Sequence, residues 1–181
     1  MDVVIVGDGP GGLSAALFLA KNGLSTVVYG QDKTAMHWAQ LRNYLGINDM
    51  HGSEFQKNAR LQVGRFGALL EDRLVEAVVR EGNGFVIQLE GGQRVSARYV
   101  ILSEGKSPRL AQELGASFEG ARVVTDKNNQ TSVPGVYAVG RSARPGRSQA
   151  IISAGDGAVA AIDILSREKG QDFSDWDSPP K

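Results

Sequence analysis

The 181-residue chain contains no cysteine. Without thiols it cannot form a disulfide, bind a metal through thiolates or carry a redox-active dithiol. It has only two histidines, His37 and His51, which we expect to be surface loop residues. A multi-histidine metal site is therefore not expected, and no metal is predicted. Any redox chemistry would have to belong to a bound organic cofactor.

Neither sign of charge is in excess, because Lys and Arg together number 20 and Asp and Glu together also number 20. That balance gives no general attraction to nucleic acid or to an anionic membrane, and we expect neither as a partner. The apolar runs are too short to span a bilayer. With no signal peptide before the first expected strand, a cytoplasmic protein is predicted.

The length suits one domain. We expect this domain to cover residues 1–171. The last ten residues, 172–181, contain two prolines and alternating acidic residues and are predicted to be a mobile tail.

The chain begins with a dinucleotide-binding pattern. Four apolar β-formers at residues 3–6 indicate a buried parallel strand, and Gly7, Gly9 and Gly12 follow in the G-x-G-x-x-G spacing before an Ala-rich helix. In this arrangement the first helical N–H groups and the helix dipole attract a pyrophosphate. The alternative is a glycine turn in an α/β domain that binds no nucleotide.

A second strand is predicted at residues 25–29 and a helix at residues 53–69, with a start near Ser53 and Glu54. An acidic residue about 20 positions after the glycines usually binds the adenosine ribose. Asp32 lies near that point, and it either contacts the ribose or is a solvated turn residue.

From residue 72 the pattern changes to short β segments separated by glycine pairs, which indicates a three-stranded antiparallel meander between about Leu74 and Ser96. Strands at residues 99–102 and 135–139 and a helix over residues 148–166 should follow. The predicted fold class is α/β, a Rossmann-like parallel sheet with an antiparallel β-meander.

Several segments together resemble the FAD domain of low-molecular-weight thioredoxin reductases, and the resemblance covers nearly the whole chain. The segments are the glycine turn at residues 6–12, residues 29–33, Asn-Tyr-Leu-Gly at 43–46, Ser-Glu-Gly at 103–105, Thr-Ser-Val-Pro-Gly-Val-Tyr-Ala-Val-Gly at 131–140 and Gln-Ala-Ile-Ile-Ser-Ala-Gly-Asp-Gly at 149–157.

Three departures accompany this resemblance. In that family an NADPH domain with a Cys-x-x-Cys motif interrupts the FAD domain, but here only residues 106–122 bridge the gap, as in a solitary FAD domain. Arg141 stands where the family has an aspartate near the ribityl chain. Asp8 and Glu104 place carboxylates in turns that are usually neutral.

The role of Arg141 has three interpretations. It would compensate the charge of the pyrophosphate, pair with Asp8 and oppose FAD, or belong with Arg144 and Arg147 to a solvated basic loop.

The resemblance implies FAD as cofactor, with the start of the last helix stabilising reduced flavin. It assigns cofactor contacts to Gly7, Gly9, Pro10, Gly11, Gly12, Tyr29, Gly30, Asp32, Asn43, Leu74, Gly105, Gly140, Arg141, Gln149, Ala150, Ile151, Ser153 and Ala154. No residue is identified as a catalytic acid, base or nucleophile.

The predicted function is an FAD-dependent oxidoreductase that passes hydride or electrons through the flavin without a protein dithiol. NAD(P)H as a transient donor, a separate reductase or electron acceptor protein, and a homodimer are compatible with it. A non-catalytic FAD-binding module, a degenerate scaffold without flavin and, more weakly, an NAD-binding dehydrogenase are the alternatives.

Overall fold

The computed structural model describes residues 1–179. A five-stranded parallel sheet forms its centre, in the order β12-β9-β1-β2-β5. These strands are β1 (Val3–Val6), β2 (Thr26–Gly30), β5 (Leu69–Asp72), β9 (Tyr99–Leu102) and β12 (Val136–Ala138). The predicted Rossmann-like sheet is confirmed.

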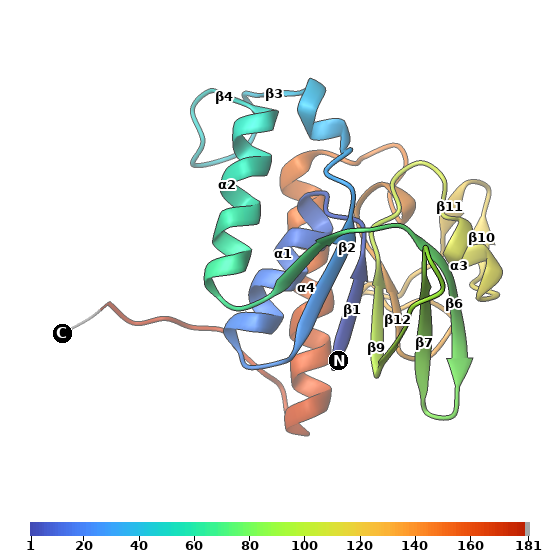
Figure 1. Ribbon diagram of the computed structural model, residues 1–181. Helices are drawn as coiled ribbons and strands as arrows, with labels where there is room; N and C mark the ends of the chain where they lie inside the picture. Colours follow the sequence, from blue (N-terminus) through green and yellow to red (C-terminus); the bar gives the residue numbers. More distant parts are fainter. Residues whose placement is uncertain (180–181) are drawn as a thin grey trace.

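Side chains of β1 alternate between two cores because successive residues of a strand point to opposite faces. Val3 and Ile5 pack with helices α1 (Pro10–Lys21), α2 (Gly52–Arg65) and α4 (Ala150–Lys169), whereas Val4 packs with the meander. Figure 1 shows α1, α2 and α4 on one side of the sheet and the meander strands on the other.

The predicted meander is present as β6 (Val75–Glu81), β7 (Gly84–Leu89) and β8 (Arg94–Ala97), paired antiparallel in that order. The remaining elements are short: η1 (Ala35–Trp38), β3 (Gln40–Leu41), β4 (Met50–His51), α3 (Arg109–Glu113), β10 (Phe118–Glu119), β11 (Arg122–Val123) and η2 (Gly140–Ser142). Residues 106–122 hold only α3, β10 and the first residue of β11, and no domain is inserted there.

The predicted helix at residues 53–69 is wrong at its C-terminal end. The helix α2 starts at Gly52, capped by the His51 side chain, and ends at Arg65. Gly67 then adopts a φ of +89°, which favours glycine, and the chain enters β5 at Leu69. This strand forms the edge of the parallel sheet beside β2.

The C-terminal segment contacts the helices without forming regular structure over residues 172–179. Phe173 packs beside the helical core, and Lys21 at the end of α1 forms ion pairs with Asp175 and Asp177. The predicted mobility of the tail stays a prediction, and its last two residues lie outside the described part of the chain.

Candidate functional site

The glycine turn connects β1 to α1 with unused hydrogen-bond donors. Gly9 caps α1 without a side-chain partner, and Pro10 occupies the first turn of the helix. The first backbone hydrogen bond of this turn runs from the Leu13 N–H to the Gly9 carbonyl at 3.0 Å. Within residues 1–179, no acceptor is recorded for the N–H groups of Gly11 and Gly12. Such a helix N-terminus is suited to bind an anion.

The glycines of this turn have different roles. A side chain at Gly12 would overlap the Gly7 carbonyl, and one at Gly11 would lie 3.0 Å from the Ser153 carbonyl, so both glycines permit close packing. A Cβ at Gly9, in contrast, would meet only the Ser103 hydroxyl at 3.9 Å. The open side of the turn is therefore above Gly9, where a pyrophosphate would approach.

The start of α4 faces the same region. Its N-cap residue, Gln149, provides no side-chain cap, and the first backbone bond of the turn runs from the Ser153 N–H to the Gln149 carbonyl at 2.9 Å. A Cβ at Gly140 would lie 3.3 Å from the Ser153 hydroxyl, and Gly140 has a φ of +68°. The glycine turn, the loop after β12 and the first turn of α4 thus meet at the carboxyl edge of the sheet, at the top of Figure 1.

The small residues of α4 also serve its packing against α1. A Cβ at Gly157 would overlap the Gly11 carbonyl, whereas no atom lies within 4 Å of the position that a Cβ would take at Gly155. Close packing thus accounts for Gly157, while the first turn of α4 holds Ala150, Ile151 and Ser153, which the sequence predicts to contact the cofactor.

Asn43 and Gln149 lie in direct contact although 106 residues separate them. The Asn43 amide Nδ2 donates to Gln149 Oε1 at 3.0 Å. Both side chains are exposed. The predicted flavin contacts from the middle and the end of the chain are therefore neighbours in the fold.

Arg141 does not pair with Asp8. Asp8 is a buried residue whose carboxylate is ion-paired with Arg60 on α2 and also accepts the Asp32 N–H at 3.1 Å. This corrects the interpretation in which Asp8 and Arg141 neutralise each other, which missed the basic residue on the inward side of α2.

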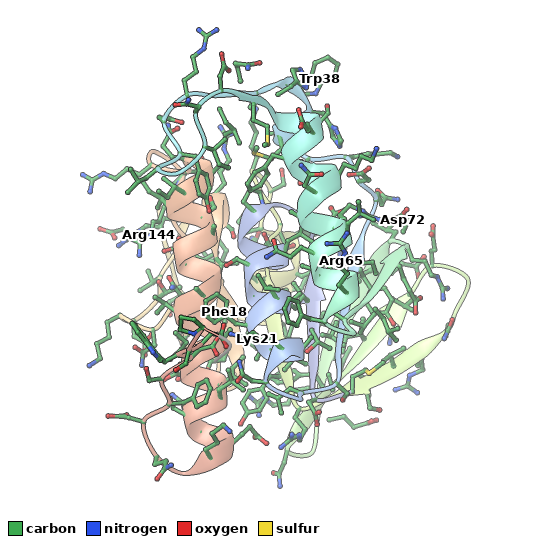
Figure 2. The ribbon with its side chains drawn as sticks, turned by 90° about the vertical axis from the view of Figure 1, so that its left-hand side faces the viewer. Phe18, Lys21, Trp38, Arg65, Asp72 and Arg144 are labelled. Carbon is green, nitrogen blue, oxygen red and sulfur yellow. The ribbon has the colours of Figure 1, made fainter. Side chains whose placement is uncertain are left out.

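The other arginines of this loop have different surroundings. Arg144 donates through Nε to both carboxylate oxygens of Asp156, at 2.8 and 3.0 Å, and Figure 2 shows it beside α4. Asp156 is buried and also accepts the Gly140 N–H at 3.3 Å. Arg141 is half-buried, and among residues 1–179 no hydrogen bond or ion pair is recorded for its side chain.

The Glu104 side chain binds N–H groups of the first turn of α3, whose N-cap residue is Pro108. The Glu104 carboxylate accepts the N–H groups of Leu110 and Ala111 at 2.8 and 3.1 Å. Burial raises the pKa of this carboxyl above its ordinary value, against the lowering effect of the two backbone donors. Glu104 thus has partners of its own, and Gly105 follows with a φ of +75° and open space around it.

The residues predicted to contact the adenosine half of FAD differ in burial and in their partners. The Tyr29 side chain is buried in the core on the meander side, so only its backbone reaches the turn, where its carbonyl accepts the Gly7 N–H at 2.8 Å. Asp32 is exposed, has a φ of +51° and contacts His37 Nε2 through Oδ1 at 3.1 Å. Leu74 is exposed at the start of the meander.

An apolar cavity of about 250 Å³ lies between α1, α2 and the loop before β4. Pro10 and Ala154, both predicted cofactor contacts, lie on its wall with Tyr44, Ile47 and Phe55. Within the described residues, no cluster of three or more histidine or acidic side chains suited to a metal is present, and no helix is long and apolar enough to cross a membrane.

The fold and this edge define a dinucleotide-binding α/β protein. The FAD binding domain family matches residues 2–167, and the chain belongs to that family. The residues fit FAD by their geometry, because Gly9 leaves open space beside two helix N-termini and their free N–H groups.

Curated relatives are thioredoxin reductases. The chain is 32% identical over 124 residues to the thioredoxin reductase of Helicobacter pylori, which covers 65% of this chain and 39% of that protein. It is 35% identical over 115 residues to the bifunctional thioredoxin reductase/thioredoxin of Mycobacterium leprae, covering 61% and 25%. The chain thus spans about two fifths or less of these relatives.

Solved structures share the fold. A thioredoxin reductase from Gloeobacter violaceus superimposes with a TM-score of 0.86 at 18% identity, covering 97% of this chain and 98% of that one. A ferredoxin-flavin thioredoxin reductase from Clostridium acetobutylicum has a TM-score of 0.81 at 18% identity, covering 93% and 97%.

Gln56, Arg60 and Asp156 are polar residues near the site that the sequence patterns do not predict. The first two lie four residues apart on the side of α2 that turns inward, and Gln56 is fully buried. Polar residues at core-facing positions of an amphipathic helix were the available signal.

Proposed function

We propose that this protein is an FAD-dependent oxidoreductase whose flavin exchanges hydride or electrons without a dithiol of this chain. The observation that carries the proposal is the open space over Gly9, flanked by the uncapped first turns of α1 and α4. In the proposed complex the pyrophosphate lies against α1, and the flavin lies near Asn43 and Gln149.

Bound FAD would supply the redox chemistry. The chain's own residues bind and orient it. The free N–H groups and the dipole at the start of α4 favour negative charge near Ala150 and Ile151. Arg141 provides a guanidinium without an ion-pair partner among the described residues, which supports its proposed role at the pyrophosphate.

The proposed electron donor is either NAD(P)H that docks transiently or a separate reductase. The proposed electron acceptor is another protein. A homodimer and a cytoplasmic location are further parts of it. Because the chain has no cysteine, the protein with NADPH alone should not reduce thioredoxin.

The alternative of a scaffold that cannot bind flavin required Asp8, Glu104 and Arg141 to spoil the site. Asp8 is ion-paired with Arg60, and the Glu104 side chain binds N–H groups of the first turn of α3. These contacts favour binding over the degenerate scaffold. They leave the non-catalytic FAD-binding module as the second candidate.

Titration of the apoprotein with FAD tests the proposal, and reduction of the bound flavin by NADH or NADPH separates an enzyme from a binding module. Gly9→Val should abolish FAD uptake, because its side chain occupies the approach to the phosphates. The matched control is Gly64→Val at an exposed, uncrowded position of α2. Wild-type protein that takes up no FAD, or Gly9→Val protein that binds as the control does, would show the proposal to be wrong.

A further inference from the structure

The end of β2 lacks the side chain that dinucleotide folds normally place there. A carboxylate about 20 residues after the glycines generally binds the adenosine ribose, but β2 ends in Gly30. A Cβ at Gly30 would lie 2.6 Å from Asp8 Oδ1 and 2.7 Å from Asp8 Cβ. The Asp8 side chain therefore fills this space, and it excludes an acidic side chain at position 30.

Asp8 is held firmly in that place. Its carboxylate accepts the Asp32 N–H and the Arg60 guanidinium, and its backbone carbonyl accepts Gln56 Nε2 at 2.6 Å. Gln56 is fully buried, and no partner is recorded for its Oε1 within the described residues. Asp8 and α2 thus form one polar unit behind the glycine turn.

Arg60 extends this unit toward solvent. Its Nη2 donates to Asp72 Oδ1 at 2.7 Å, and Asp72 ends β5 as the register partner of Gly30. Figure 2 shows Asp72 beside α2. The exposed fraction of the side chain increases from 4% for Asp8 to 19% for Arg60 and 60% for Asp72. These three charged side chains therefore run from the protein interior to the solvent-exposed carboxyl ends of β1, β2 and β5.

The two ribose hydroxyls both donate and accept hydrogen bonds, so an arginine beside a carboxylate can bind them. Asp32 lies two residues beyond the end of β2, and its Oδ1 contacts His37 Nε2 at 3.1 Å. A buried ion pair is also weak evidence for stability alone, because apolar residues often replace such pairs without loss.

We infer that Arg60 and Asp72 bind the ribose hydroxyls of the adenosine half of FAD, with Asp8 as the residue that positions Arg60. In this arrangement Arg60 donates to a ribose oxygen, and Asp72 accepts a ribose hydroxyl. The inference rests on the proposed FAD site and identifies which residues recognise one end of it.

The test uses the apoprotein and measures competition with FAD by ADP and by 2′,3′-dideoxy-ADP, which lacks both hydroxyls. Wild-type protein should prefer ADP by about tenfold or more, the usual effect of losing charge-assisted hydrogen bonds. Asp72→Asn at the exposed end, and the neutral pair Asp8→Asn with Arg60→Gln, should reduce the preference to about threefold or less. Arg65→Gln, an exposed residue at the end of α2, is the matched control and should keep the wild-type preference.

A second variant guards against a folding defect. Asp8→Ala combined with Gly30→Glu moves the carboxylate to the strand end and should retain a preference for ADP. Wild-type protein that binds FAD but does not distinguish the two nucleotides would overturn the inference and leave the proposed function intact. So would an unchanged preference in Asp72→Asn. Failure of the wild type to take up FAD would instead contradict the proposed function.

Discussion

The Asn43 amide donates a 3.0 Å hydrogen bond to Gln149 Oε1 and joins the loop before β4 to the N-cap of α4. The two residues are 106 positions apart in the sequence. In Figure 1 the loop (light blue) and the start of α4 (orange) both lie along the upper edge of the molecule. The bond links the two segments that the proposed flavin would contact.

Truncating either side chain should change the affinity for FAD more than it changes the free energy of unfolding. Asn43→Ala and Gln149→Ala should each lower the affinity for FAD and change the fluorescence of the bound flavin. Because both side chains are exposed, the free energy of unfolding of the apoprotein should change by about 1 kcal/mol or less. A double-mutant cycle of FAD affinity would measure their coupling. Asn48→Ala, an exposed asparagine of the same loop, is the control, and equal FAD affinities in all variants would contradict the prediction.

Arg141 should contribute to FAD affinity. Arg141→Ala is expected to weaken FAD binding by about 1–3 kcal/mol, the range for one charge-assisted hydrogen bond. Titration of the apoprotein measures this, with Arg147→Ala as the control in the same loop. Tighter binding by Arg141→Asp would mean that the arginine opposes the cofactor, and the charge-compensation role would then be wrong.

Asp156 should stabilise the loop that carries Arg141. Asp156→Ala removes a buried carboxylate that accepts bonds from Arg144 and the Gly140 N–H. We expect a loss of about 1–3 kcal/mol in the free energy of unfolding, measured by urea denaturation. Asp156→Asn retains an acceptor for Gly140 and should lose less. If the alanine and asparagine variants are as stable as the wild type, the buried carboxylate does not hold the loop.

Glu104 should make stability depend on pH. Burial raises the pKa of its carboxyl above 4.5, so the folded state binds this proton more tightly than the unfolded state. The resulting stabilisation is complete below pH 4.5 and is lost as the pH rises through the folded-state pKa. Relative to Glu104→Gln, which cannot titrate, the wild type should therefore lose stability as the pH rises above 4.5 and through the folded-state pKa. If the difference in denaturation midpoint between the wild type and Glu104→Gln does not change with pH, the predicted role of Glu104 in the pH dependence is wrong.

Local patterns in the sequence were sufficient to predict most of the fold. The strand–glycine–helix start, the hairpin glycines of the meander and the β12-to-α4 segment each depend on neighbouring residues, so their structures follow from short-range sterics. The end of α2 was predicted too late, since residues 66–69 are compatible with a helix until β5 pairs with β2. A strand that forms only by pairing with a distant strand has a weak local signal.

The class of site follows from local sequence, because the glycine spacing fixes a turn and an open helix N-terminus. Which charges meet there depends on the packing of distant segments. Asp8 pairs with Arg60, 52 residues away, and Arg144 rather than Arg141 pairs with Asp156. An ion pair depends on distance in space, and the positions of α2 and α4 over the sheet are set by packing of the whole core.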